Sequence, residues 1–447
     1  MEKNKMATMP ISKLLLNMGL PMMLSMLGQA LYNVVDTFFV SRIHGGEMAI
    51  NALTLAFPIQ MLIIALGVGT GVGINALISR LLGMKEQRQA ENAAGNALFM
   101  SVLYFIGMLL FGLLGARAFI TSQTTIPTVA RWGIEYLRII AIFSLGTLGY
   151  MCLEKITIAT GRTKITMLTQ LAGAITNIIL DPILIYGMFG LPVLGVRGAA
   201  IATVIGQFVS LIGIGLFYIN KNPILSIHWT DFYPQLDILR NLYRIGIPAI
   251  MMQLLVPIMS YAMNLILGSI SEASITAYGI YYKLQNFVFM PAYGLNNASI
   301  PIISYNYGAN HPNRIRSTIR WALIDSMLIM GIGVILLEGW ATSIVSIFAV
   351  SKSTTALCVW ALRVIVWGFF FAGANIILQG VCQALGNGKY SLIISLIRFI
   401  LIPLPFAYLI HSQQNVWFAI PLGEAIGTIV AILLTKHIYK ESVGMYE

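Results

Sequence analysis

Charged residues are scarce in this chain of 447 residues. Lysine, arginine, aspartate and glutamate together make up 10% of it, whereas they account for roughly a quarter of ordinary soluble domains. Hydrophobic residues make up 58%, and the mean hydropathy is +0.82. This composition excludes a soluble globular protein and indicates an integral membrane protein.

Cysteine and histidine are also rare. The three cysteines, Cys152, Cys358 and Cys382, are odd in number and lie in or beside apolar runs, which argues against a disulfide framework. The five histidines fall in loops or at the ends of apolar segments, and neither a His-Glu-x-x-His nor a Gly-x-Ser-x-Gly motif occurs. We therefore expect no enzymatic activity and no cofactor.

The net charge of +11 comes from basic residues that are scattered at the ends of apolar segments rather than gathered in one patch. This distribution reflects membrane topology and not nucleic-acid binding. Eighteen basic residues lie at segment ends on the side of the N-terminus, and five lie at the opposite ends, namely Arg42, Arg117, Arg131, Arg197 and Lys352. The positive-inside rule then predicts a multi-pass protein of the cell (plasma) membrane with both termini cytoplasmic. We expect it to be a monomer whose partners are membrane lipids and small molecules.

Twelve apolar segments are long enough to cross a bilayer as helices, which satisfy their own backbone hydrogen bonds there. The first segment is too long for the apolar region of a signal peptide and lacks a small-residue cleavage site, so we expect it to remain as a span. The segments are 13–41, 50–79, 92–115, 127–153, 165–189, 198–219, 241–268, 273–304, 317–338, 355–382, 390–410 and 416–436.

The second half of the chain repeats features of the first half. The turn that begins at Gly83 aligns with the turn that begins at Gly308, and Gly161–Lys164 aligns with Gly386–Lys389. In both pairs, the same number of residues separates a position in the first half from its counterpart in the second half. We call this number of residues the repeat offset. Because each repeat holds an even number of spans, the two halves share one orientation and are related by an axis along the membrane normal.

These observations predict an all-α protein of two six-helix lobes related by a pseudo-two-fold axis along the membrane normal. We expect an N-lobe at 1–219, a cytoplasmic inter-lobe linker at 220–239, and a C-lobe at 240–447.

Two carboxylates stand inside apolar spans of the first half. A helix rise of about 1.5 Å per residue places Asp36 and Thr203 roughly 9 Å below the outer surface and Asp181 roughly 13 Å below it. Asn177 stands four residues before Asp181, on the same helix face. A carboxylate at such depth indicates a functional site, although each acid taken alone could also be a structural hydrogen-bond partner. Two carboxylates with neutral oxygens suit a proton or a hard cation such as Na⁺, and the residues do not separate these two ions.

The second half lacks these acids and carries Lys283, Arg398 and Glu424 within its spans instead. Two interpretations remain open for them. They form a neutralised pair or triad that holds the lobe together, or they form a polar wall of a substrate cavity.

Three motifs together resemble the multidrug and toxic compound extrusion (MATE) family, over essentially the whole chain. They are Tyr32–Thr37 in the first span, Asn177–Pro182 in the fifth and Gly198–Thr203 in the sixth. The resemblance is strongest to the bacterial branch that keeps its cation site in the N-lobe. Other branches also use acids in spans 7 and 10, where this chain has Gln253 and Gln379.

The resemblance implies an antiporter that exports cationic, amphipathic drugs in exchange for inward H⁺ or Na⁺ by alternating access. It implies that the positions for cation binding or protonation, including any bound Na⁺, are Asp36, Asn177, Asp181 and Thr203. We expect the substrate cavity to include Tyr32, Gln207, Lys283 and Arg398. The main alternative is a flippase for lipid-linked oligosaccharides from the same superfamily, which would need a strongly basic cavity for pyrophosphate. A receptor or purely structural role would leave the acid cluster unexplained.

Overall fold

The computed structural model describes residues 4–43, 45–221, 225–348 and 351–444, and these residues form helices and loops without a β-strand. Residues 222–224 of the predicted linker lie outside the described ranges.

The described helices account for the twelve predicted spans. Nine helices are long and apolar enough to cross a membrane, and two further pairs of helices pass the same test together, with bends of 42° and 49° between their members. Helix α11 completes the set, although polar residues such as Lys283 and Gln285 lower its hydropathy. In chain order the spans are α2 (Ile11–Ser41), α3 (Gly46–Gly83), α4 with the π-helical turn η1 and α5 (Gln87–Thr121), α6 with α7 (Pro127–Ile142 and Leu145–Ala159), α8 (Thr163–Tyr186), α9 (Val196–Lys221), α10 (Leu236–Ile270), α11 (Glu272–Gly308), α12 (Pro312–Gly339), α14 with α15 (Lys352–Ile365 and Gly368–Ala384), α16 with η4 and α17 (Gly388–Ile410), and α18 (Ala419–Ser442).

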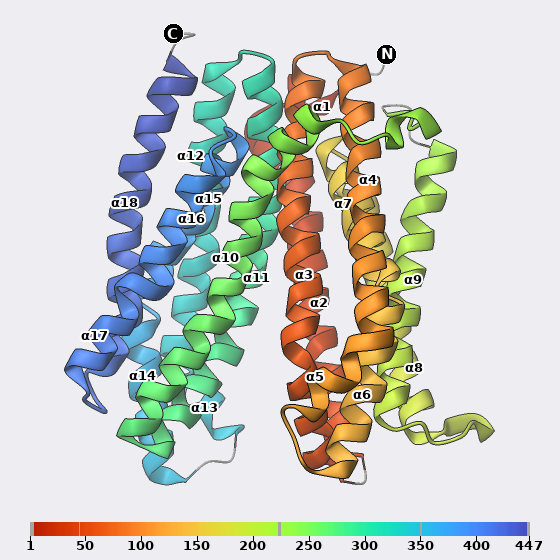
Figure 1. Cartoon of the computed structure of the whole chain (residues 1–447). Coiled ribbons are helices and arrows are strands. Elements are labelled where there is room, and N and C mark those ends of the chain that lie inside the picture. Colours follow the sequence, from red (N-terminus) through yellow and green to blue (C-terminus); the bar gives the residue numbers. More distant parts are fainter. Residues whose placement is uncertain (1–3, 44, 222–224, 349–350, 445–447) are drawn as a thin grey trace.

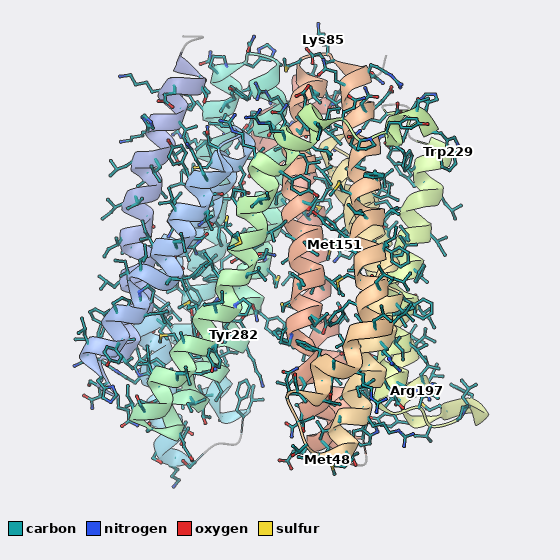
Figure 2. All side chains as sticks on the ribbon, in the orientation of Figure 1. Met48, Lys85, Met151, Arg197, Trp229 and Tyr282 are labelled. Atoms are coloured by element: carbon teal, nitrogen blue, oxygen red, sulfur yellow. The ribbon has the colours of Figure 1, made fainter. Side chains whose placement is uncertain are left out.

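The spans form two lobes that stand side by side, with α2 to α9 in one and α10 to α18 in the other (Figure 1). The short helix α1 (Lys5–Thr8) and the last turns of α18 lie at the same end of the molecule, which we call the inner end. The short helix α13 (Ala341–Ser346) lies at the opposite, outer end (Figure 1). Lys85 marks the inner end, and Met48 and Arg197 mark the outer end (Figure 2). The all-helical, two-lobe architecture predicted from the sequence is thus confirmed.

The segment between the lobes packs against the inner end of α4. The 3-10 helix η3 (Trp229–Phe232) holds Asp231, whose buried carboxylate lies 2.7 Å from the guanidinium of Arg88 on α4. The side-chain amide of Asn96 donates to the backbone carbonyl of Asp231 at 3.1 Å. This segment therefore lies against the N lobe before the chain enters α10 at Leu236.

The predicted repeat is visible in individual hydrogen bonds. The Ser79 hydroxyl donates to the carbonyl of Ala159 at 3.2 Å, and the Ser304 hydroxyl donates to the carbonyl of Ala384 at 2.9 Å. The repeat offset relates Ser79 to Ser304 and Ala159 to Ala384, so the two hydrogen bonds are equivalent. The turns that follow also match, since Gly161 and Gly386 have φ of 86° and 84°. A left-handed backbone of this kind favours glycine, which explains the recurrence of Gly at these positions.

The lobes touch through two helix crossings that the repeat relates. A Cβ atom on Gly69 of α3 would lie 2.5 Å from the backbone nitrogen of Ile250 on α10. Gly294 of α11 is the counterpart of Gly69 at the repeat offset, and a Cβ atom on it would lie 2.7 Å from the backbone of Met22 on α2. Glycine is required at both positions because the two backbones approach so closely.

The inner ends of α3 and α11 meet in a third contact. A Cβ atom on Gly83 would lie 2.0 Å from the carbonyl oxygen of Tyr305, and one on Gly308 would lie 2.1 Å from the carbonyl oxygen of Arg80. The repeat offset relates Gly83 to Gly308 and Arg80 to Tyr305, so the two halves of this contact are equivalent. These contacts close the inner half of the lobe interface.

The outer half of the same interface is open. On the face of α2 that meets α11, buried Met22 is followed about three turns later by Asn33, which is exposed. On α11, buried Gly294 is preceded about two turns earlier by Phe287, which is 41% exposed. Tyr261 on the outer half of α10 is 68% exposed. The lobes therefore enclose a cleft between them that opens at the outer end.

Helix α1 fastens the inner end of the N lobe to the C lobe. The guanidinium of Arg314 on α12 donates to the carbonyls of Met6 and Met9, at 2.9 Å each. The Lys5 ammonium donates to the side chain of Asn17 at 2.7 Å. Breaking the lobe contact at this end would expose these groups, so α1 stabilises the observed, inwardly closed arrangement.

Lys5 is expected to lose its proton at an unusually low pH. Burial and the nearby cations of Lys164 and Arg162 lower its pKa from 10.5 to about 8. Between these values the unfolded chain binds more protons than the folded chain, so this group raises stability as the pH increases through that window. Methyl NMR of the reductively ¹³C-methylated protein, with Lys5→Arg to assign the signal, measures the midpoint. A midpoint near that of an ordinary lysine, about 10.4, would contradict the expectation.

Candidate functional site in the N lobe

The four residues predicted for cation binding come together near the outer side of the N lobe. Asn177 on α8 donates through its amide to Asp181 Oδ1 and to Thr203 Oγ1 on α9, at 3.4 Å each. The carboxyl groups of Asp36 on α2 and Asp181 lie next to each other and interact directly. Asn177, Asp181 and Thr203 are 2%, 0% and 5% exposed. One polar cluster thus draws residues from three helices.

The local sequence explains how α8 and α9 reach each other. A Cβ atom on Gly173 would lie 2.5 Å from the carbonyl oxygen of Gly206, and one on Gly206 would lie 2.7 Å from the carbonyl oxygen of Gly173. This contact between two glycines brings the helix backbones close together. Asn177 stands one turn beyond Gly173 on α8, so its short side chain can span to Thr203.

Three oxygens of the cluster are buried without a hydrogen-bond partner among the described residues. They are Asp36 Oδ1, Asn177 Oδ1 and Asp181 Oδ2. Buried polar atoms are normally paired, so unpaired ones need an explanation. Two carboxylates are acceptors only, and they repel each other unless a proton or a cation lies between them. Tyr32 and Tyr136 border the two acids. The arrangement is chemically suited to hold one positive charge.

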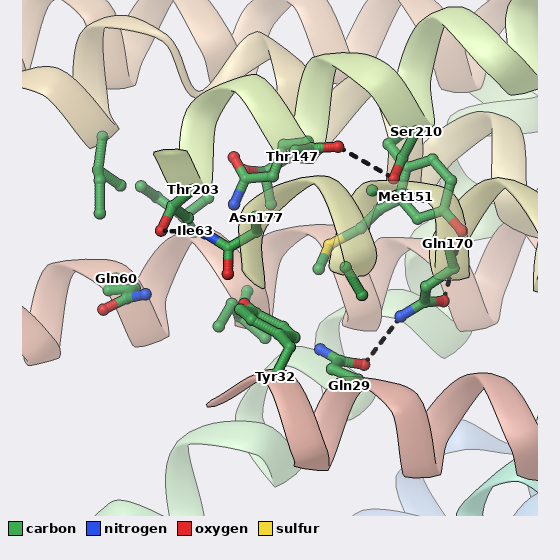
Figure 3. Close-up of a pocket in the computed structure, with 17 residues that line it drawn as sticks. Gln29, Tyr32, Gln60, Ile63, Thr147, Met151, Gln170, Asn177, Thr203 and Ser210 are labelled. Atoms are coloured by element: carbon green, nitrogen blue, oxygen red, sulfur yellow. Dashed lines mark hydrogen bonds between the residues drawn. The ribbon is translucent and has the colours of Figure 1, made fainter. Parts of the chain in front are cut away.

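A cavity of about 100 Å³ lies directly beside this cluster, inside the N lobe (Figure 3). Asn177, Thr203 and Tyr32 face the cavity on the side of the two acids (Figure 3). Gln207 lines it from α9. The structure thus places two of the four predicted cavity residues, Tyr32 and Gln207, at one site. The lining residues are Gln29, Tyr32, Gln60, Ile63, Ile64, Ile140, Thr147, Tyr150, Met151, Gln170, Gly173, Ala174, Asn177, Thr203, Gly206, Gln207 and Ser210.

Four glutamines give the cavity its polarity, and three of them were not anticipated from the sequence. Gln170 donates to Gln29 Oε1 at 3.1 Å (Figure 3) and also accepts a hydrogen bond from the Ser25 hydroxyl at 2.8 Å. Gln207 accepts from the Thr147 hydroxyl. Gln60 faces the cavity from α3 (Figure 3). Glutamine within an apolar span is the signal that could have identified them, because a buried amide needs hydrogen-bond partners inside the bundle.

The other two predicted cavity residues lie elsewhere. Lys283 is exposed on α11. Arg398, in the π-helical turn η4 (Ile397–Leu401), has only 1% of its side chain exposed, so it forms no wall of an open cavity. Its guanidinium donates twice to Glu424 on α18, at 2.8 Å each, and once to Gln379 at 3.1 Å. Asn375 also donates to the Glu424 carboxylate at 2.8 Å. The expectation that Arg398 lines a substrate cavity is therefore corrected, and the neutralised-pair interpretation holds for Arg398 and Glu424, without Lys283.

The repeat shows what occupies the corresponding place in the C lobe. At the repeat offset, Arg398 is the counterpart of Gly173, and the missing side chain of Gly173 leaves room beside the N-lobe cavity. A Cβ atom on Gly427 would lie 2.5 Å from Arg398 Cγ, so the arginine stem runs where the helices would otherwise touch. Two further residues that line the N-lobe cavity, Tyr150 and Gln170, correspond to Asn375 and Ser395. Both counterparts belong to the hydrogen-bond network of the C-lobe ion pair. Asn375 donates to Glu424, and Ser395 accepts a hydrogen bond at 2.8 Å from Gln379, the partner of Arg398. In the C lobe, the guanidinium of Arg398 therefore occupies the place that corresponds to the N-lobe cavity.

No group of three or more His, Cys, Asp or Glu side chains that could hold a metal ion occurs within the described ranges. The N-lobe cluster contributes two carboxylates only. Its chemistry suits a proton or a weakly bound monovalent cation and not a tightly held transition metal.

Comparisons with known proteins agree with this architecture. The chain is 24% identical over 437 residues to the multidrug export protein MepA of Staphylococcus aureus (strain MRSA252). This match covers 95% of this chain and 93% of that protein. The chain is 26% identical over 427 residues to MepA of Staphylococcus haemolyticus (strain JCSC1435), with the same coverage. Among solved structures, a MATE in complex with MaL6 and an outward-facing multidrug resistance MATE family transporter of the MOP superfamily each superpose with a TM-score of 0.92, at 24% identity and 98% coverage of both chains.

The sequence model of the MatE family matches residues 21–183 and 248–409, one segment in each lobe. These segments cover more than half of the chain, and the resemblance inferred from the motifs is confirmed. The chain belongs to the MatE family of membrane transporters.

Proposed function

We propose that this protein is a secondary active multidrug exporter that moves cationic, amphipathic compounds out of the cell in exchange for inward H⁺ or Na⁺. The observation that carries the proposal is the pair of buried carboxylates, Asp36 and Asp181, whose unpartnered oxygens lie beside a polar cavity. The relatives named multidrug export proteins support drugs as the substrate class.

Each residue of the cluster has a distinct role in this proposal. Asp36 and Asp181 together take up the coupling ion, because either a shared proton or a bound Na⁺ relieves their mutual repulsion. Asn177 orients Asp181 through its hydrogen bond, and Thr203 supplies a neutral oxygen. Removal of negative charge on ion uptake weakens the attraction for a cationic compound in the adjoining cavity, so the compound is released.

Alternating access follows from the open outer cleft and the closed inner contact. We place the inner end in the cytoplasm of the cell, as the distribution of basic residues predicts. The coupling ion then enters from outside through the open cleft. Rocking of the lobes about their shared interface exposes the site to the cytoplasm, where the ion leaves and the next compound binds.

The charges of the described residues do not favour a flippase. A pyrophosphate group requires several uncompensated cations in one cavity. Arg398 is neutralised by Glu424, which leaves Lys283 as the remaining cation of the pair considered for that role.

Dye transport in proteoliposomes tests the proposal and identifies the ion. A fluorescent cationic dye is loaded, and a pH gradient and a Na⁺ gradient are imposed in separate experiments. One gradient is expected to drive uphill dye movement while the other has no effect. Protein-free liposomes and collapse of the gradient with an ionophore are the controls. Dye movement that ignores both gradients would refute the antiport mechanism.

A further inference from the structure

Lys283 is a cation at membrane depth that has no role in the site described above. It stands 11 residues into α11, or roughly 16 Å along the helix axis. No carboxylate among the described residues pairs with it, whereas the buried Lys155 of the N lobe lies 3.5 Å from Glu154. A charged side chain inside a membrane span faces water or a partner rather than lipid, so its surroundings must provide one.

The helix periodicity shows which way Lys283 faces. It precedes Gly294 by 11 residues, which is about three turns, so both stand on the same face of α11. Gly294 packs against Met22 of α2 in the N lobe. Lys283 therefore lies on the lobe-facing side of α11, in the outer part where the cleft is open. Its neighbour Tyr282 lies in the outer half of the C lobe (Figure 2).

The crossing of α2 and α11 also sets the register of the two helices. They run antiparallel, so 11 residues outward from Gly294 on α11 correspond to 11 residues outward from Met22 on α2, which is Asn33. Asn33 is exposed on the opposite wall of the cleft. Asp36 follows three residues later, about 4.5 Å further out, which is within the length of an extended lysine side chain.

We propose that Lys283 is a built-in competitor for the N-lobe carboxylates, which pairs with Asp36 when the outer cleft closes and thereby releases the coupling ion. The inference rests on the proposed ion-coupled function. While the cleft is open, the ammonium is held away and the acids accept the ion. Closure brings the ammonium to Asp36, where the other groups are Asp181, Tyr32 and Tyr136. A bound ion and the ammonium repel each other, so the closed state favours the ion-free carboxylate.

Transport assays separate this role from a structural one. Lys283→Gln is expected to lower gradient-driven dye transport about tenfold and to leave dye–dye counterflow within about twofold of wild type. Lys283→Arg keeps the charge and should retain gradient-driven transport. Lys352→Gln removes an exposed lysine at the outer start of α14 and is the matched control. Gradient-driven transport at the wild-type rate in Lys283→Gln, or loss of both activities in Lys283→Arg as well, would overturn the proposal.

A cross-linking experiment tests the approach of the two helices without any substrate. Cysteines are placed at Asn33 and Lys283 after the native cysteines are replaced by alanine, and a short bifunctional thiol reagent is added to the reconstituted protein. A cross-link is expected, and a pair at Leu16 and Lys283, whose positions lie in opposite halves of the membrane, should give none. Absence of the first cross-link would overturn the proposal. If wild-type protein moves no dye but the cross-link forms, the proposed transport function fails while the approach of Lys283 stands.

Discussion

Replacement of Asp181 by asparagine is expected to reduce ion-driven dye export on the order of 100-fold, and replacement of Asp36 by asparagine should have the same effect. Asp181 is 0% exposed, accepts a hydrogen bond from Asn177 and faces Asp36. Asparagine has nearly the same shape but cannot take up a proton or supply a negative charge. Loss of a buried charged interaction worth about 2.7 kcal/mol corresponds to a factor of about 100.

Matched variants separate coupling from folding. Asp325→Asn removes a carboxylate from α12 of the other lobe and should leave transport within about twofold of wild type. Asp181→Glu keeps the charge and should retain partial activity. The measurement is the initial rate of gradient-driven dye movement in proteoliposomes that contain equal amounts of folded protein. Wild-type rates in both Asp36→Asn and Asp181→Asn would contradict the role assigned to this pair.

The sequence predicted the spans and the repeat because both depend on properties of single segments. Hydrophobicity over about 20 residues identifies a span wherever its neighbours lie. The repeat was visible at Gly161 and Gly386 because each occupies a left-handed position that glycine fills without strain. The acids were identified for a similar reason, since a carboxylate such as Asp36 is anomalous in any apolar segment.

The cavity and its glutamines could not be predicted in the same way. Gln170 is one polar residue in a moderately apolar helix, and its importance lies in Gln29 and Ser25, which are far away in the chain, on α2. Whether Arg398 lines a cavity or forms an ion pair likewise depends on a contact between helices. Only the packed structure shows that Glu424 lies 2.8 Å from it. Pairing across helices is a property of the fold, and the order of residues in a single chain does not specify it.

The asymmetry between the lobes has a physical origin in a single repeated position. Gly173 in the N lobe lets α8 and α9 touch and leaves space beside them, whereas Arg398 in the C lobe fills that space. A guanidinium buried there needs a carboxylate, and Glu424 supplies it. The lobes thus keep one backbone plan, while the place beside the N-lobe cavity is occupied in the C lobe by the paired side chains of Arg398 and Glu424. This arrangement fits the proposed mechanism, in which the C lobe moves as a rigid body against an N lobe that we propose binds the coupling ion.

Removal of one member of the C-lobe ion pair should therefore destabilise the protein more than removal of both. Arg398→Met leaves Glu424 as an unpaired buried charge, and we expect this to lower the free energy of unfolding by about 3–5 kcal/mol. The double variant Arg398→Met/Glu424→Gln leaves no charge in the network, so most of that loss should be recovered. The exposed pair of Arg363 and Glu338, 3.5 Å apart, is the matched control, and Arg363→Met should cost less than about 1 kcal/mol.

Thermal unfolding of the purified variants in one detergent gives the comparison, because all four proteins share the same solvent and differ only at these side chains. If Arg398 instead had to be charged for transport, the double variant would fold well and yet move no dye. If the pair is a packing element of a rigid lobe, the double variant should transport dye within about tenfold of wild type, because Arg398 and Glu424 are sealed away from both the cleft and the N-lobe cavity. A single variant as stable as wild type would show that Glu424 is neutralised by some means other than Arg398.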